Sequence, residues 1–440
     1  MFGCHFGKLF QVTVAGGSYQ EGLTSVVQGV PPGMEMTEKE IYADMLLRKP
    51  GTDELSSPRK EPDLPVIYTG LNAAETIENA GNKNHTNGTP LTILIPNLDR
   101  DFVHIKQYQD TNRTPRPGHA SYASFRKYGP DDDAIGAGFF SGRYTSTIVS
   151  AGAVARKILK DHSINIFSYI KEAAGVLCPE IPYDKIFDYH KNYKKMRCSL
   201  DVFYQEIYEK NRVTMDMRFL EKMHEFANIE KELVEIRKKR VRLSPEEIRD
   251  KYGVHHVLLC PDISVADEML NACKKITKSG DSSGGVVEVI ALGVPVGLGE
   301  PMFDKMDAEL GKMLGLGAVK CVEIGAGFKA KDMTGSQSND QIISKDGKVE
   351  FLSNNAGGIT GGLTSGQPIV VRLTVKPTPT IDREQKTIDK YTLENKTIAA
   401  ITRRDPNIVG RLWPVAEAMT AIILLDNLMM FNALKSMMKK

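Results

Sequence analysis

Short apolar runs bounded by polar turns occur in both halves of the chain. Residues 66–70, 91–96, 284–291, 319–324 and 368–375 have this pattern, which is typical of β-strands. Residues 6–32 read as a strand, a glycine-rich turn and then a helix-like stretch that ends at Pro31-Pro32-Gly33. The pattern therefore predicts a protein of mixed α and β structure.

Helical periodicity appears in three other places. Residues 35–49 place Ile41, Met45 and Leu46 on one side. Residues 136–159 begin with small residues and continue as an apolar helix, which fits either a phosphate or flavin cradle or close helix packing. Residues 414–434 predict a terminal helix, the most apolar of the chain. Glu417 and Asp426 interrupt it, which favours a buried or subunit-facing helix over a membrane span.

The block of residues 178–256 has a different composition, rich in Lys, Glu, Arg and Tyr. It predicts a helix over about 217–240, and Ser244-Pro245-Glu246-Glu247 predicts the start of another. We interpret the block as a helical insertion within a single domain of residues 1–440. Its charges are typical of a solvated face.

Composition excludes several classes of protein. The 440 residues carry a formal charge of only +2, which gives no electrostatic case for binding nucleic acid or a membrane surface. The six cysteines are scattered without metal-like spacing, so we predict reduced thiols, no metal site and a cytoplasmic protein. An anionic ligand would need a local cluster of basic side chains.

Candidate chemistry is concentrated in loops. His119 lies at the tip of the turn Arg116-Pro117-Gly118-His119-Ala120, where a ligand could reach it and where it could act as a general acid. Glycine-rich turns over 353–362, and the segment 376–380 with its lysine and threonines, could hold a phosphate through backbone N–H groups. Residues 402–406 (Thr-Arg-Arg-Asp-Pro) could equally be a surface Arg–Asp pair.

Taken together and in order, these segments resemble the chorismate synthase family. The opening 6–20, the Arg-Pro-Gly-His-Ala turn, residues 136–145, the glycine-rich segment 353–368, Lys-Pro-Thr-Pro at 376–379 and residues 402–406 all have counterparts there. The resemblance covers about 1–175 and 257–434. It implies an α+β fold in which helices lie between two antiparallel sheets, usually assembled as a homotetramer.

The resemblance also implies a reaction, a cofactor and a site. The family is a reduced-FMN-dependent lyase that eliminates phosphate from 5-enolpyruvylshikimate 3-phosphate to give chorismate, and a flavin reductase is a further expected partner. The implied catalytic residues are His119, Asp405 and Tyr19, and the implied substrate contacts are Arg48 and Arg143. The implied cofactor contacts are Ser141, Gly142, Ala318, Gly361, Gly362, Lys376, Thr380 and Arg403.

Several positions depart from the family pattern. Tyr19 stands where the family has a catalytic histidine, and a tyrosine is the weaker acid at pH 7. Leu47 and Phe139 replace arginines, Glu54 replaces a basic residue, Tyr144 replaces a glutamate and Arg404 replaces a histidine. We expect Tyr19, Leu47, Glu54, Phe139 and Arg404 to lie on the side that holds the phosphorylated substrate. Two alternatives therefore stay open: an FMN-dependent enzyme for a less anionic cyclic substrate, and a non-catalytic binding or assembly protein.

Overall fold

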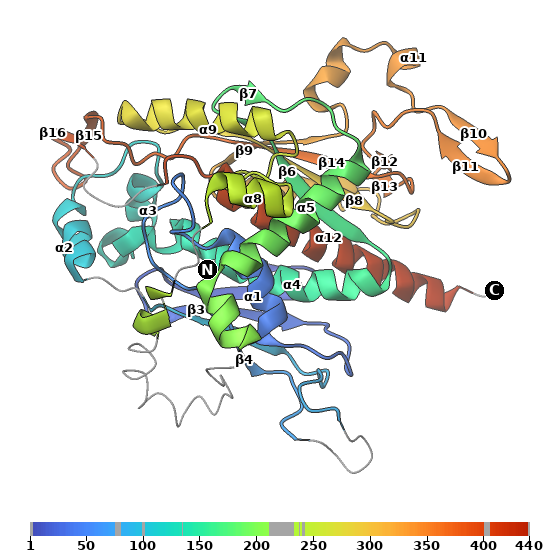
Figure 1. Cartoon of the computed structure of the whole chain (residues 1–440), viewed down its shortest axis with the longest axis horizontal. Coiled ribbons are helices and arrows are strands. Elements are labelled where there is room, and N and C mark those ends of the chain that lie inside the picture. Colours follow the sequence, from blue (N-terminus) through green and yellow to red (C-terminus); the bar gives the residue numbers. More distant parts are fainter. Residues whose placement is uncertain are drawn as a thin grey trace.

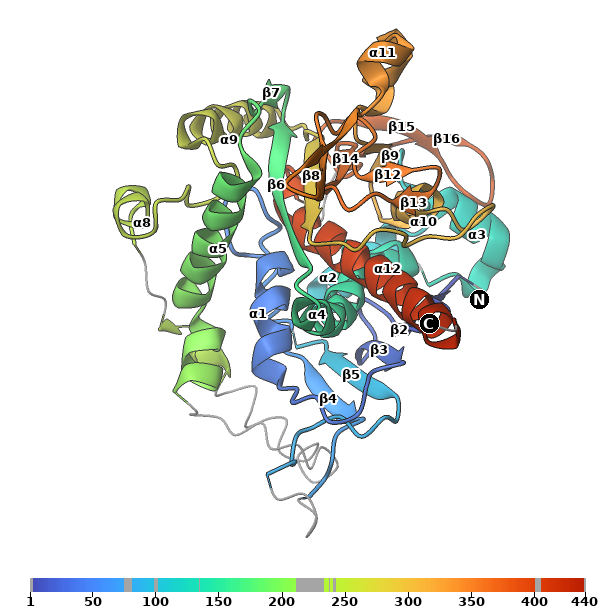
Figure 2. The ribbon, with the colours of Figure 1, turned by 90° about the vertical axis from the view of Figure 1, so that its right-hand side faces the viewer.

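Two five-stranded antiparallel sheets enclose a layer of helices (Figures 1 and 2). The computed structural model describes residues 3–74, 81–98, 102–133, 135–210, 233–236, 238–239, 243–399 and 405–438. The arrangement confirms the predicted α+β class, with helices between two sheets. The division into one domain with an insertion stays a prediction.

The strands of each sheet come from distant parts of the chain. In the first sheet the order is β1 (His5–Phe6), β2 (Gln11–Gly16), β3 (Gly22–Gln28), β5 (Leu91–Pro96) and β4 (Val66–Thr69). In the second it is β7 (Val176–Leu177), β6 (Asn165–Ala173), β8 (Gly285–Leu292), β14 (Ile369–Val375) and β9 (Val319–Ile324). Separate hairpins pair β10 (Ile342–Lys345) with β11 (Lys348–Phe351), β12 (Ile359–Thr360) with β13 (Leu363–Thr364), and β15 (Gln385–Ile388) with β16 (Asn395–Ile398).

Three helices form the middle layer, namely α1 (Glu38–Arg48), α4 (Thr145–Asp161) and α12 (Val409–Met437) (Figure 2). The other helices lie around them: α2 (Phe102–Thr111), α3 (Ser121–Tyr128), α5 (Tyr183–Leu200), α8 (Pro245–Tyr252), α9 (Ile263–Lys278), α10 (Met306–Gly311) and α11 (Gly335–Ser338). Short 3₁₀ turns over Ile135–Phe140 and Gly142–Tyr144 lead into α4.

The small residues of α4 permit close helix packing. A Cβ added to Gly152 would lie 2.3 Å from the Cβ of Ala418 in α12, a distance that real side chains do not tolerate. Of the two interpretations of this stretch, the structure therefore supports close packing at Gly152. The 3₁₀ turns before the helix contain the predicted site residues Ser141, Gly142 and Arg143.

The helix-like stretch expected before Pro31 is wrong, because residues 22–28 form the strand β3. Leu23 and Val27 are buried four residues apart, a spacing that suits a helix, but Ser25 between them is buried as well. Its hydroxyl lies 2.9 Å from that of Ser150 in α4. The alternation is that of a strand, and pairing with both β2 and β5 overrides the local ambiguity.

The two acids of α12 are satisfied inside the protein. Asp426 accepts hydrogen bonds from the backbone N–H groups of Lys8, Leu9 and Phe10 at 2.7–3.0 Å. Of the described helices only α12 has the length and composition to cross a bilayer, and 78% of its apolar stretch is buried among the protein's own residues. It is therefore a core helix, as predicted.

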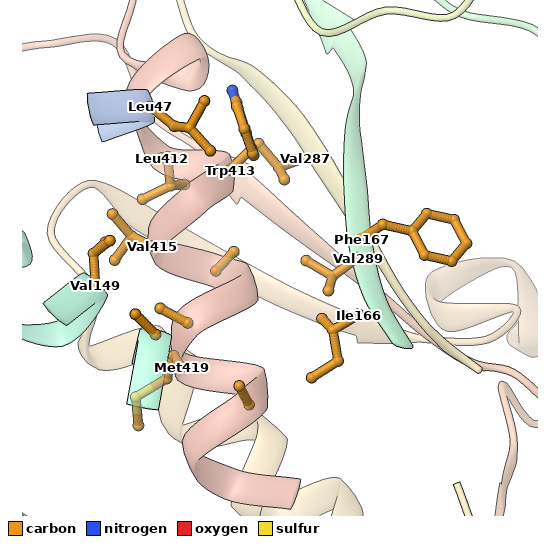
Figure 3. Close-up of a cluster of buried hydrophobic side chains, with 14 of the residues drawn as sticks. Leu47, Val149, Ile166, Phe167, Val287, Val289, Leu412, Trp413, Val415 and Met419 are labelled. Atoms are coloured by element: carbon orange, nitrogen blue, oxygen red, sulfur yellow. The ribbon is translucent and has the colours of Figure 1, made fainter. Parts of the chain in front are cut away.

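The apolar core lies where α12 meets the second sheet (Figure 3). Trp413 and Leu412 of α12 lie beside Leu47 of α1 in this cluster, and Leu47 is 1% exposed. The expectation that Leu47 faces the substrate is therefore wrong. A leucine at this position adds to the core, where an unpaired arginine would be costly.

The predicted insertion is partly described. It contains α5, a π-helical turn over Tyr204–Glu209 and α8. Ser244 caps α8 in a capping box with Glu247, as the sequence predicts. Most of the helix predicted over 217–240 lies outside the described residues.

Candidate active site

Two loops that are distant in sequence meet around His119. Arg116 lies between them: one nitrogen of its guanidinium group lies 3.5 Å from the Thr380 hydroxyl and another lies 3.4 Å from the His119 ring. Gly118 has a φ of +70°, and a Cβ there would lie 3.9 Å from the Lys376 Nζ. The structure thus brings together His119, Lys376 and Thr380, as the sequence predicted.

His119 is held neutral in this setting. Burial, together with the nearby charges of Arg116 and Lys376, lowers the pKa of His119 to about 3. A hydrogen bond with the backbone of Phe140 opposes the shift. At pH 7 the ring therefore has one donor and one acceptor nitrogen in the absence of a bound anion.

Lys320 is a cation of this cluster that the sequence analysis missed. In the pairing of β9 with β14, Val319 and Cys321 lie opposite Val375 and Thr374, so Lys320 is the extra residue of a bulge. Burial lowers the pKa of Lys376, and the charge of Lys320 lowers it further. Ala318, with a φ of +71°, accepts a hydrogen bond from the Lys376 N–H at 2.9 Å. A bulge is not visible in a single sequence.

The glycine-rich segment is fixed by an acid in the loop before it. The Asp340 carboxylate accepts hydrogen bonds from Ser353 Oγ at 2.6 Å, and from the N–H groups of Asn355 and Ala356 at 2.7 and 2.9 Å. Gly361 and Gly362 have φ values of +65° and +92°, which only glycine adopts without strain. Their predicted contact with a cofactor stays a prediction.

A second group of contacts connects His119 to Tyr19. The hydroxyl of Ser141, the residue after Phe140, donates to the Ser18 hydroxyl at 3.1 Å. Arg59 donates to the hydroxyl and the carbonyl oxygen of Ser18, both at 3.1 Å. The guanidinium carbon of Arg59 lies 5.1 Å from the centre of the Tyr19 ring, a cation–π contact. Arg59 is another residue without an assigned role in the sequence analysis.

The predicted substrate contacts Arg48 and Arg143 are both paired with Asp63. Arg48 Nη2 lies 3.0 Å from one carboxylate oxygen and Arg143 Nη1 lies 2.5 Å from the other. Burial alone would raise the pKa of Asp63, but the two arginines hold it below its usual range. Burial lowers the pKa of Arg48 to about 9, and Asp63 opposes that shift. Arg48 is 1% and Arg143 4% exposed, so any substrate contact has to displace part of this pairing.

Asp405 closes the circuit of contacts. Its carboxylate accepts from Arg411 Nη1 at 2.7 and 2.8 Å, and from the Ser57 N–H at 2.7 Å. Its carbonyl oxygen accepts from the Thr378 hydroxyl, between Lys376 and Thr380, at 2.7 Å. Arg411 also donates to the carbonyl oxygen of Arg48. The predicted contact Arg403, and Arg404 beside it, lie outside the described residues.

Two more departures from the family pattern have local partners. Glu54 pairs with Lys274 at 2.8 Å, and both side chains are at least 40% exposed. Phe139 and Tyr144 contact each other, with ring centres 4.7 Å apart. Because the family has an arginine and a glutamate at these two positions, this chain has an aromatic pair where an ion pair could form. Glu54 lies in an exposed ion pair. Phe139 precedes Phe140, whose backbone hydrogen-bonds to His119, so among the described departures both Tyr19 and Phe139 belong to segments that reach the site.

Comparisons with known proteins show which family the chain resembles. The family model "Chorismate synthase" matches residues 10–429. A chorismate synthase of Acetivibrio thermocellus is 36% identical over 445 residues, which cover 97% of this chain and 95% of that protein. The chorismate synthase of Methanosarcina mazei is 34% identical over 430 residues, which cover 98% of this chain and 97% of that protein. The chorismate synthase of Methanocaldococcus jannaschii is 36% identical over 424 residues, which cover 96% of this chain and 95% of that protein.

A solved structure titled "Crystal Structure of Chorismate Synthase" supports the fold independently. It superposes with a TM-score of 0.62 at 23% sequence identity, and the match covers 97% of this chain and 93% of that one.

Proposed function

The chain belongs to the chorismate synthase family, and we propose that it converts 5-enolpyruvylshikimate 3-phosphate to chorismate and phosphate with reduced FMN as its cofactor. In this 1,4-elimination a C–O bond breaks and its electron pair leaves with the phosphate, while a C–H bond breaks and its proton is released. The relatives favour this reaction over the two alternatives that the substituted residues left open.

One observation carries the proposal. A circuit of contacts runs from Thr380 through Arg116 to His119, which hydrogen-bonds to the backbone of Phe140, and from the next residue, Ser141, through Ser18 to Arg59. It returns through Ser57, which accepts from the Arg59 N–H and donates its own N–H to Asp405, to Thr378. Each segment of the circuit is one that resembles the family's motifs, so distant parts of the sequence converge on one place. A decayed scaffold would not need to preserve all of these contacts.

The residues around His119 fit an anionic flavin. Arg116, Lys320 and Lys376 supply positive charge, and the Thr380 hydroxyl and backbone N–H groups supply donors. Ser141 and the glycine-rich turn with Gly361 and Gly362 are the further residues that would hold it. When bound, reduced flavin would supply an electron-rich ring and a basic nitrogen next to the substrate.

The protein's own side chains would supply proton handling and orientation. His119 would hold a proton at the flavin, and Asp405, oriented by Arg411, would help remove the substrate proton. Tyr19 would donate a hydrogen bond to the departing phosphate. Arg48 and Arg143 stay predicted substrate contacts. Each would exchange its ion pair with Asp63 for one with the substrate.

The test is release of phosphate by the purified protein with reduced FMN under anaerobic conditions. We expect turnover by the natural chain, and a loss of about a hundredfold or more in kcat for His119→Asn. His162→Asn, an exposed histidine after α4, is the matched control and should retain activity. Absence of phosphate release by the natural chain would refute the proposed reaction.

The proposed assembly is a cytoplasmic homotetramer, served by a flavin reductase. Exposed apolar side chains support assembly, above all on the projecting hairpin of β10 and β11 (Figure 1), where Ile342 is 63% and Val349 71% exposed. A two-stranded hairpin is marginally stable by itself, so a partner surface would stabilise it.

A further inference from the structure

Tyr19 and Arg59 form a unit that the family's histidine pattern does not contain. The Arg59 guanidinium group is fixed by two hydrogen bonds to Ser18, at its hydroxyl and its carbonyl oxygen. The Tyr19 ring lies over it at 5.1 Å. The plane of the guanidinium group is therefore set by the hydroxyl and the carbonyl oxygen of the residue next to Tyr19.

The surroundings of Arg59 contain an excess of positive charge. Among the described residues, the connected network has four guanidinium groups, those of Arg48, Arg59, Arg143 and Arg411. It has three carboxylates, those of Glu61, Asp63 and Asp405. Burial raises the pKa of Glu61, which weakens its hold on a negative charge. A partly buried network with surplus positive charge favours an anion at its edge.

Arg59 is the arginine of this network whose charge is balanced least. Arg48 and Arg143 share Asp63, and Arg411 holds both oxygens of Asp405. Among the described residues, Arg59 pairs with the carboxylate of Glu61, at 3.4 Å, and Arg143 approaches the same oxygen at the same distance. The hydrogen bonds from Arg59 to Ser18 go to neutral oxygens, so among the described residues Arg59 shares its one paired carboxylate with Arg143.

We propose that Tyr19 and Arg59 together recognise the phosphate group that leaves the substrate, with the tyrosine hydroxyl as hydrogen-bond donor and Arg59 as the positive charge that fixes and supports it. This inference rests on the proposed function. It explains why a tyrosine is compatible with the reaction at this position: a charge under the ring takes over what a protonated histidine would supply.

The test measures phosphate affinity apart from turnover. Inorganic phosphate is titrated by calorimetry into the natural chain with oxidised FMN, which does not turn over. We expect Arg59→Gln to weaken phosphate binding about tenfold or more, because a charged hydrogen bond is lost. Arg59→Lys should recover part of the loss. Lys60→Gln, which removes the adjacent exposed cation, should leave the affinity within about twofold.

A second variant separates recognition from folding. Tyr19→Phe keeps the ring over Arg59 and removes only the hydroxyl, so the fold and FMN binding should be unchanged. We expect kcat for phosphate release to fall while KM changes little, since the hydrogen bond matters most as charge develops on the phosphate. Phosphate affinity that is equal in the natural chain and Arg59→Gln, with both folded, would overturn the inference. Absence of phosphate release by the natural chain would instead refute the proposed function.

Discussion

At the scale of single residues, the pKa of His119 is governed first by burial and then by the charges beside it. Its ring lies near Arg116 and Lys376, and burial together with these cations holds its pKa at about 3, against an ordinary value near 6.5. An anion between the two cations would cancel their repulsion and raise this pKa. His119 can therefore act as a proton carrier only when an anionic cofactor or substrate is present.

This predicts that binding of reduced FMN is accompanied by proton uptake. Between pH 3 and 6.5 the unliganded folded protein binds fewer protons at His119 than the unfolded chain, so stability falls as pH decreases through this range. A bound anion raises the pKa of His119, because it offsets the charges of Arg116 and Lys376. Calorimetry in two buffers of different ionisation enthalpy should show a fractional proton taken up at pH 6.5 by the natural chain.

His119→Asn should abolish most of this uptake, whereas the exposed His162→Asn should preserve it. Equal proton uptake by the natural chain and His119→Asn would contradict the assignment, because another group would then be titrating.

The sequence predicted which residues converge but not what each of them touches. The resemblance placed His119, Lys376 and Thr380 in one site, and the structure brings them together. The resemblance could not reveal that Asp63 pairs with both predicted substrate arginines, because an ion pair depends on where the folded backbone places the two side chains. The core position of Leu47 was equally hidden, because a helical residue's surroundings depend on packing.

At the scale of elements, α5 of the predicted insertion is built into the core. His190 Nε2 lies 2.8 Å from Glu417 Oε1 in α12, and Arg156 of α4 lies 2.6 Å from the other oxygen of Glu417. The rings of His190 and Tyr193 both contact Trp413 edge-on. The composition of residues 178–256 indicated a solvated face. The sequence pattern could not show that the opposite face of α5 carries His190, which pairs with the buried Glu417 of α12.

Glu417→Gln should therefore destabilise the protein strongly. Removing one charge of a buried cluster leaves Arg156 with only the more distant carboxylate of Asp44, at 3.7 Å, which costs about 3 kcal/mol in the free energy of unfolding. Burial would raise the pKa of Glu417, but His190 and Arg156 hold it below its usual range. Its stabilisation is thus present above about pH 4.5 and is lost as pH falls.

Urea unfolding at pH 7 and pH 4 measures both effects. The variant should lose stability at pH 7 and show a weaker dependence on acid than the natural chain. Glu180→Gln is the control, because its pair with Lys171 involves a carboxylate that is 79% exposed, and it should change stability by at most about 1 kcal/mol. A change of similar size in both variants would argue against a special role for the buried cluster.

At the scale of the whole molecule, the layered architecture is what the resemblance implied. The helix α12 is strongly apolar because it lies between the two sheets and is mostly buried. The helical interpretation failed at β3, because the spacing of Leu23 and Val27 suits both a helix and a strand, and pairing with β2 and β5 decided between them. The number of subunits is not encoded in any local pattern, because it depends on surfaces that meet only in the assembly.

The hairpin of β10 and β11 offers a direct test of that number. Its register places Val349 opposite Ser344 and Ile342 opposite Phe351, so Val349 and Ile342 share one face while Ile343 lies on the other. If the Val349 face contacts a second copy, Val349→Glu should place a charge in the interface and reduce the assembly from four copies of 48.7 kDa.

Light scattering after size exclusion measures the mass, with Ile343→Glu as the opposite-face control. A natural chain that is monomeric at micromolar concentration, or equal masses for the natural chain and Val349→Glu, would show that this face is not the interface.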